Sequence, residues 1–241
     1  LKAQMCVRGR EALYAFCASH GVPHARPGKL IVAAAPEEVA HLEMLAGRAA
    51  ANGVEVRLLD AAGARALEPA LHAHAALHSP ATGIVDSAAL MRALLGDMEA
   101  AGGMLALHAP VLRAEATPGG LRLDAGGAAP LTLRCRLLVN AAGLDAPALA
   151  AAIAGLPPER VPAQRLAKGT YFSCARRVPF RHLIYPVPEP GGLGTHLTLD
   201  LGGQARFGPD VQWVDARDYG VDPARKAAML GLSGALIAFN W

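Results

Sequence analysis

Three strand signals separated by glycine turns, followed at once by a wholly apolar segment, constrain this fold more than any other sequence feature. The strand signals are Val111–Thr117, Leu121–Ala125 and Leu131–Cys135, with Pro118-Gly119-Gly120 and Gly126-Gly127 between them. Alternating apolar residues with turns this short predict an antiparallel β-meander. The next segment, Leu137–Val139, is apolar at every position, as is typical of a strand buried on both faces of a parallel sheet. It leads into a turn of small residues, Asn140 to Gly143.

Helices and strands alternate over the rest of the chain. Helices are predicted where apolar residues recur at helical spacing, with Asp60 and Asp86 as N-caps and Gly21 just past a C-terminus. The helices are Lys2–His20, Pro36–Ala51, Asp60–Leu67, Asp86–Ala101 and Pro147–Ile153. The further strands are Lys29–Ala34, Val54–Leu59, Ala75–His78, Met104–His108, Ala167–Ser173, His182–Tyr185, Gly194–Asp200 and Gln204–Phe207. This order predicts a mixed α/β fold.

Charge and cysteine usage exclude several functions. The net charge of +3, from 23 basic and 20 acidic residues, is too balanced and scattered for a nucleic-acid partner. No apolar run is long enough for an integral membrane segment. The sequence has four cysteines and none of them form a CxxC pair; they are Cys6, Cys17, Cys135 and Cys174. This pattern favours small buried thiols in a reducing cytoplasm, and disulfides are left open as an alternative. Three histidines at near-alternate positions lack a converging acidic or thiolate partner, so no metal is expected at His72, His74 and His78.

Polar side chains alternate along the predicted strand Gly194–Asp200. His196, Thr198 and Asp200 should point to one face, which either lines a substrate pocket or faces water. Tyr185 is either a core or surface tyrosine or a hydroxyl donor to a substrate carboxylate. Lys168 binds an anion or is an ordinary surface lysine. Arg206 is open to the same two interpretations, as a bidentate carboxylate ligand or a surface residue.

Several segments together resemble the D-amino-acid-oxidase-like flavoproteins. Leu137–Ala150 (LLVNAAGLDAPALA) is similar to the rear part of their FAD domain, where small residues let the backbone approach the dinucleotide. Segments similar to the L-2-hydroxyglutarate dehydrogenase/oxidase branch are Leu59–Leu71, Leu77–Leu94, Leu166–Phe172, Leu183–Asp210 and Val221–Arg225. The most specific of these holds Tyr-Pro-Val-Pro followed by Gly-x-His-x-Thr. The resemblance covers about residues 1–225.

The resemblance implies an α/β fold in two interleaved domains. A partial FAD-binding parallel sheet with the β-meander would comprise residues 1–21 and 79–155. A substrate domain built on a mainly antiparallel sheet would comprise residues 22–78 and 156–207. Residues 208–241 would form an atypical tail, since 226–241 do not resemble the family at that place.

The resemblance also implies a chemistry. FAD would accept a hydride from an L-2-hydroxy acid such as L-2-hydroxyglutarate, giving a 2-oxo acid, with the electron acceptor left open. Cofactor-binding residues would be Val111, Ala141, Ala142 and Gly143. Substrate-binding residues would be Tyr185, His196, Thr198 and Lys168. The alternatives are a flavin amine oxidase acting on glycine or sarcosine, and a non-catalytic remnant.

The sequence departs from the family pattern in two places, because both the N-terminal dinucleotide-binding motif and the C-terminal Gly-rich segment that closes over the flavin are missing. No GxGxxG follows a first strand, so the usual pyrophosphate-binding turn is missing. The family's likely catalytic base would lie upstream of Leu1, where the chain starts without methionine. We therefore expect an internal fragment, cytoplasmic, with peripheral attachment to the inner membrane through an electron acceptor as an alternative.

Overall fold

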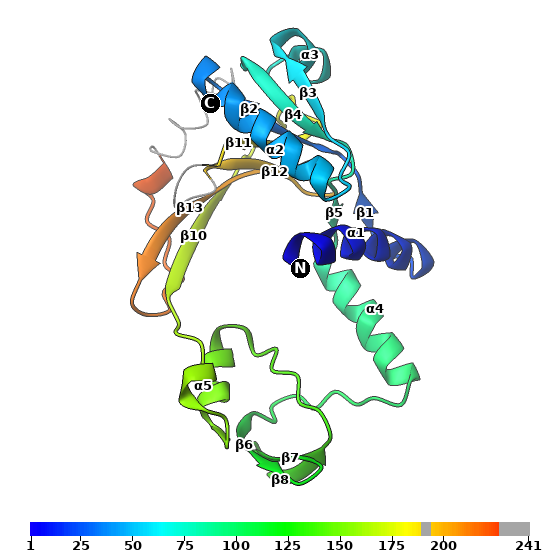
Figure 1. Cartoon of the computed structure of the whole chain (residues 1–241), viewed down its shortest axis with the longest axis vertical. Helices are drawn as coiled ribbons and strands as arrows, with labels where there is room; N and C mark the ends of the chain where they lie inside the picture. Colours follow the sequence, from blue (N-terminus) through cyan, green and yellow to red (C-terminus); the bar gives the residue numbers. More distant parts are fainter. Residues whose placement is uncertain (189–193, 227–241) are drawn as a thin grey trace. The chain divides into compact units, whose positions relative to one another are not determined.

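A computed structural model describes residues 1–188 and 194–226 in two compact units. Unit 1 comprises Leu1–Gly96 and Ala167–Trp241, and unit 2 comprises Asp97–Leu166. Figure 1 shows the elements along the chain. The mixed α/β class predicted from the sequence is confirmed, whereas the division into a cofactor and a substrate domain stays a prediction. No helix among the described residues is long and apolar enough to cross a membrane.

Unit 1 is built on a seven-stranded sheet of order β10-β13-β12-β11-β2-β4-β3. Its strands are β2 (Lys29–Ala33), β3 (Arg57–Asp60), β4 (Ala75–Ser79), β10 (Leu166–Ser173), β11 (Leu183–Pro186), β12 (His196–Leu199) and β13 (Ala205–Val214). β2 and β11 run parallel, whereas β12 pairs antiparallel with β11 and β13, and β4 pairs antiparallel with β2 and β3. A separate short pair joins β1 (His24–Ala25) to β5 (Ile84–Val85).

Two helices of unit 1 begin directly after the caps that the sequence predicts, Asp60 and Asp86. The helices of this unit are α1 (Lys2–Ser19), α2 (Val39–Ala51) after a 3-10 turn at Pro36–Glu38, α3 (Ala61–Leu67) and α4 (Ser87–Ala100), which continues into unit 2. The Asp60 carboxylate accepts the Gly63 N–H at 2.7 Å, and that of Asp86 accepts the Ala89 N–H at 2.9 Å. Both bonds satisfy amide groups that a helix N-terminus leaves without partners.

Apolar side chains cover the two faces of the large sheet differently. One face holds the larger core, with Leu30, Ile184, Leu197 and Phe207 packed beside Ala64 of α3. On the other face, Leu42 of α2 packs on a second cluster formed by Ala33, Ala75, Leu77 and Val187. Figure 1 shows α2 lying over these strands. Each fully buried leucine stabilises the fold by about 1.5–3 kcal/mol.

Unit 2 contains the predicted meander, and its strand bounds differ from the predicted ones only in that the second strand begins one residue earlier, at Gly120. Its sheet has the order β8-β7-β6-β9, and the strands are β6 (Val111–Thr117), β7 (Gly120–Ala125), β8 (Leu131–Cys135) and β9 (Ile153–Ala154). β6 and β9 pair in parallel, and the other two pairs are antiparallel. A 3-10 turn at Gly143–Asp145 leads into α5 (Ala146–Ala151).

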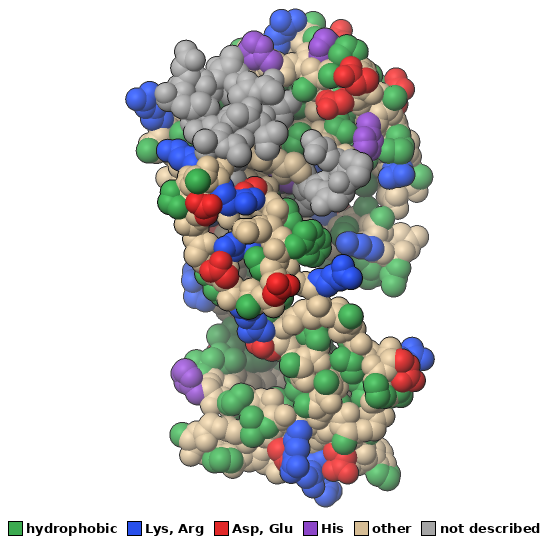
Figure 2. Space-filling view, turned by 90° about the vertical axis from the view of Figure 1, so that its left-hand side faces the viewer, with side chains coloured by type: hydrophobic (Ala, Val, Ile, Leu, Met, Phe, Trp, Pro, Cys, Tyr) green, Lys and Arg blue, Asp and Glu red, His purple; other side chains and the backbone are tan. Residues whose placement is uncertain are grey.

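Two strand predictions in unit 2 are wrong. Leu137–Val139 forms no strand, and the side chains of Leu137 and Val139 are 77% and 75% exposed. A parallel strand needs a neighbour to satisfy its amide and carbonyl groups, and no described strand pairs with this segment. Met104–His108 is likewise irregular. Hydrophobic side chains consequently lie at the surface, as Figure 2 shows.

Candidate functional site

Three polar side chains from three neighbouring strands meet on one face of the unit 1 sheet. Lys29 lies on β2, Tyr185 on β11 and His196 on β12. Tyr185 pairs with Ile31 between β11 and β2, so these two side chains lie on the same face of the sheet. Lys29 precedes Ile31 by two residues and therefore lies on that face too. We call Lys29, Tyr185 and His196 the polar stack. The second cluster, with Leu42 of α2, lies on this face, and the polar stack lies beside it on β2, β11 and β12. Tyr185 also packs against the larger core.

The rings of the polar stack lie in contact. The Tyr185 and His196 ring centroids are 3.7 Å apart and the planes differ by 6°. The Lys29 Nζ lies 4.9 Å from the Tyr185 ring centroid, a cation–π geometry that stabilises by about 0.5–2 kcal/mol. His196 is only 7% exposed. The stack thus holds a cation, a phenol and an imidazole in one fixed arrangement.

Burial changes the proton affinity of two members of the stack. Desolvation lowers the pKa of Lys29, since burial disfavours its charged form. Burial, and secondarily the neighbouring Tyr171, raises the pKa of Tyr185. Tyr185 is therefore a neutral hydroxyl donor at neutral pH. An anion beside Lys29 would favour its charged form and oppose this effect of burial.

Thr198 and Arg206 extend the polar face beyond the stack. They are register partners on β12 and β13, and the Thr198 hydroxyl donates to the Arg206 carbonyl at 3.4 Å. Asp200, predicted on the same face, instead closes the β12–β13 turn. Its carboxylate accepts the backbone N–H groups of Gly202 and Gln204, both at 2.9 Å. Short acidic side chains commonly stabilise turns in this way.

The structure does not bring Lys168 together with the polar stack. Its Nζ lies 2.5 Å from a carboxylate oxygen of Asp218 and donates to the Gly220 carbonyl at 2.9 Å. Alternation along β10 places Lys168 on the side of Phe172, which packs against the larger core. The hydrogen bond from Lys168 is the main reason that the pKa of Asp218 is lowered. A substrate role for Lys168 stays a prediction.

The predicted cofactor residues lie in unit 2, where the turn after residue 139 leaves its backbone accessible. Ala141 and Ala142 are exposed, and Val111 at the start of β6 is 37% exposed. Gly143 has φ +58°, and a Cβ added there would meet no atom within 4 Å. Asn140 shapes the turn, because its amide donates to the Ala146 carbonyl at 2.8 Å. Small residues around an open backbone fit the close approach of a dinucleotide.

Sequence reasoning missed two residues of the polar face. Lys29 belongs to a predicted strand, and Tyr171 lies on β10 on the side opposite to Phe172. The available signal was alternation, since Lys29 and Ile31 share a face. The register between β2 and β11 joins residues more than 150 positions apart, and one sequence does not reveal it.

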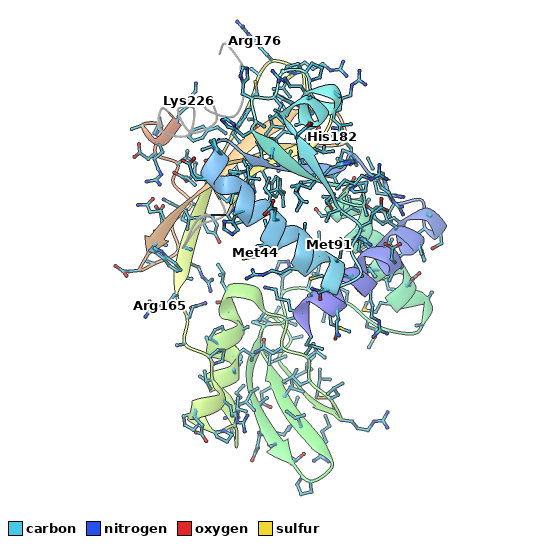
Figure 3. All side chains as sticks on the ribbon, turned by 45° about the horizontal axis from the view of Figure 1, so that its top comes forward. Met44, Met91, Arg165, Arg176, His182 and Lys226 are labelled. Carbon is cyan, nitrogen blue, oxygen red and sulfur yellow. The ribbon has the colours of Figure 1, made fainter. Side chains whose placement is uncertain are left out.

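A buried carboxylate outside this face was also missed. Glu68 accepts bonds from the Arg181 and His182 N–H groups at 2.8 and 2.7 Å, and its contact with the His182 ring is 2.7 Å. His182, labelled in Figure 3, lies beside β4, where its ring meets that of His78 edge-on at 5.4 Å. Within residues 1–188 and 194–226, no three histidine, cysteine or acidic side chains are grouped to hold a metal ion.

Comparison with known proteins gives consistent results at the levels of family, sequence and fold. The family described as FAD dependent oxidoreductase matches residues 1–237. The mitochondrial L-2-hydroxyglutarate dehydrogenase of Arabidopsis thaliana is 35% identical over 249 residues, which cover 90% of this chain and 52% of the plant protein. The L-2-hydroxyglutarate dehydrogenase of Escherichia coli strain K12 is 32% identical over 217 residues, covering 88% of this chain and 50% of that protein. The chain thus spans about half the length of these relatives.

Solved structures share the fold at low sequence identity. The L-α-glycerophosphate oxidase of Mycoplasma pneumoniae, solved with FAD bound, superposes with a TM-score of 0.85 at 18% identity, covering 99% of this chain and 64% of that one. The glycine oxidase of Geobacillus kaustophilus gives a TM-score of 0.73 at 19% identity, covering 97% and 62%. At these identities the likeness concerns the fold alone.

Proposed function

The chain belongs to the FAD-dependent oxidoreductase family, and on that premise we propose that it serves to oxidise an L-2-hydroxy acid of the 2-hydroxyglutarate type to the 2-oxo acid. The relatives with 30% identity or more that carry the name L-2-hydroxyglutarate dehydrogenase support this substrate class. Because the chain spans about half of their length, the activity is proposed for the holoprotein. By holoprotein we mean this chain together with FAD and with segments equivalent to the part of the relatives that the chain does not match.

The single structural observation behind the proposal is the polar stack of Lys29, Tyr185 and His196 on one face of the unit 1 sheet. A 2-hydroxy acid carries a carboxylate and a hydroxyl on adjacent carbons, so it needs donors that are already positioned. The Tyr185 hydroxyl, neutral because its pKa is raised, would donate to that carboxylate. His196, fixed against the Tyr185 ring, would orient the substrate hydroxyl, with Thr198 beside it.

The open turn of unit 2 would hold part of the cofactor. Ala141, Ala142 and Gly143 present backbone without bulky side chains, and Val111 would lie beneath an apolar part of the dinucleotide. When bound, FAD supplies the acceptor for the hydride that leaves C2 of the hydroxy acid. The proton of the substrate hydroxyl must pass to a base, and we assign that base to no residue of this chain.

A flavin-reduction experiment tests the proposed function. Under anaerobic conditions, L-2-hydroxyglutarate should bleach the flavin absorbance of the holoprotein, whereas D-2-hydroxyglutarate, glycine and sarcosine should not. Bleaching by glycine or sarcosine alone would favour an amine oxidase instead. Absence of bleaching by all four would favour a non-catalytic protein. We also propose a cytoplasmic location for the holoprotein.

A further inference from the structure

Lys29 is a half-buried lysine with no acidic partner among the described residues. Some basic side chains of unit 1 pair with carboxylates, such as Arg10 with Glu11 and Lys168 with Asp218. Among the described residues, no carboxylate oxygen lies within 4.0 Å of the Lys29 amine, whose recorded interaction is with the Tyr185 ring. Removing a cation from water without a counter-charge costs free energy. A bound anion beside Lys29 would offset that cost.

The position of Lys29 relative to Tyr185 and His196 indicates where a bound anion would lie. Strands β2, β11 and β12 are consecutive neighbours in the sheet, so Tyr185 lies between Lys29 and His196. Neighbouring strands are about 4.8 Å apart, so β2 and β12 are separated by roughly 10 Å. A short extended ligand could place one end near Tyr185 and His196 and its other end near Lys29.

We propose that Lys29 binds the carboxylate remote from the reacting C2–OH group, and so selects dicarboxylic over monocarboxylic 2-hydroxy acids. This assignment deepens the proposed function and rests on it for the identity of the reacting end. Tyr185 and His196 hold the carboxylate and hydroxyl that all 2-hydroxy acids share. Lys29 recognises the group that only the dicarboxylic members possess.

Ligand binding without turnover tests the assignment first. Glutarate and pentanoate have the same five-carbon chain but two carboxylates and one, respectively, and neither carries the oxidisable hydroxyl. Calorimetric titration of the wild-type holoprotein should show tighter binding of glutarate. Lys29→Met keeps the length of the side chain and removes its charge, so it should weaken glutarate binding about 10- to 150-fold, the loss expected for one hydrogen bond to a charged group. Pentanoate affinity should change less than about threefold.

Two further variants control for folding and for general charge. Lys29→Arg keeps a cation and should retain a preference for glutarate, which would show that a loss in Lys29→Met is not a folding defect. Lys2→Met removes an exposed lysine of α1 and should bind both ligands as the wild type does. Circular dichroism should be the same for all four proteins.

Kinetics separates this inference from the proposed function. Lys29→Met should lower kcat/KM for L-2-hydroxyglutarate by a similar factor and leave that for L-2-hydroxypentanoate nearly unchanged. If wild-type flavin is not reduced by L-2-hydroxyglutarate, the proposed function fails, while a glutarate preference that depends on Lys29 still supports the assignment. Equal losses for both ligands in Lys29→Met, or no loss for either, would overturn it.

Discussion

Replacing Glu68 with alanine tests how the strand that carries Tyr185 is anchored. Glu68 follows α3 and is 1% exposed, and its Oε1 atom accepts the N–H groups of Arg181 and His182 directly before β11. The same oxygen contacts Nδ1 of the His182 ring at 2.7 Å. One buried carboxylate thus joins segments 113 and 114 positions apart in the sequence.

The expected loss follows from what the alanine leaves behind. Two part-buried N–H groups and a histidine ring lose their acceptor, and each unsatisfied donor costs about 1–3 kcal/mol. Summed over the two N–H groups this is about 2–6 kcal/mol, and we expect Glu68→Ala to lose about 3–5 kcal/mol. For a chain of this size the melting temperature should drop by roughly 6–20 °C. Glu68→Gln keeps one oxygen acceptor and should lose less.

Urea unfolding followed by circular dichroism measures this loss. Glu43→Ala is the matched control, because Glu43 is an exposed glutamate in the middle of α2 and should change the free energy of unfolding by less than about 0.5 kcal/mol. A Glu68→Ala protein within about 1 kcal/mol of wild type would refute the reasoning. In that case water would replace the bonds to Arg181 and His182, and these bonds would contribute nothing to the free energy of unfolding.

Three further predictions concern the cofactor turn, cofactor retention and pH. Gly143→Val should weaken FAD binding to the holoprotein, because φ +58° disfavours a β-branched residue and the side chain would fill the open turn. The control is Gly53→Val, at φ +69° in equally open space, which should leave the flavin content unchanged. The 241-residue chain alone should retain no stoichiometric flavin after desalting, because it lacks a GxGxxG turn, and a stoichiometric flavin band would contradict this. Burial, and then His182, lowers the pKa of His78 below its usual 6.5, so the unfolded state binds more protons and stability should fall as pH drops from about 7.5 to 5. Urea unfolding of His78→Gln should show a flatter pH dependence, and an unchanged slope would remove His78 as its cause.

Local chemistry made much of the fold predictable. The first turn of the meander lies where it was predicted. Its residue Gly119 has φ +87°, a backbone conformation that other residues rarely adopt. Asp60 and Asp86 cap the helices they were expected to cap because the bond spans only three residues. Such signals depend on neighbours in the sequence, and one sequence contains them in full.

Long-range pairing was beyond the reach of the sequence. The apolar run Leu137–Val139 has the composition of a doubly buried strand, but a strand also needs a partner, and composition does not supply one. Alternation placed His196 and Thr198 on one face, and the structure agrees. It misplaced Asp200, because the Asp200 carboxylate accepts N–H groups of the turn between β12 and β13. Lys29 joined the candidate site only through the register of β2 with β11.

The rate of flavin reduction by L-2-hydroxyglutarate in variants of the polar stack tests the central claim most directly. Tyr185→Phe removes only the hydroxyl, and His196→Phe keeps a ring against Tyr185 while removing the ring nitrogens. Each lost hydrogen bond to a charged substrate should cost about 1.5–3 kcal/mol, so kcat/KM should fall about 10- to 150-fold with bound flavin unchanged. Tyr219→Phe, at a side chain that is 83% exposed, should react as the wild type does. Wild-type rates in both stack variants would contradict the assignment of this sheet face to the substrate.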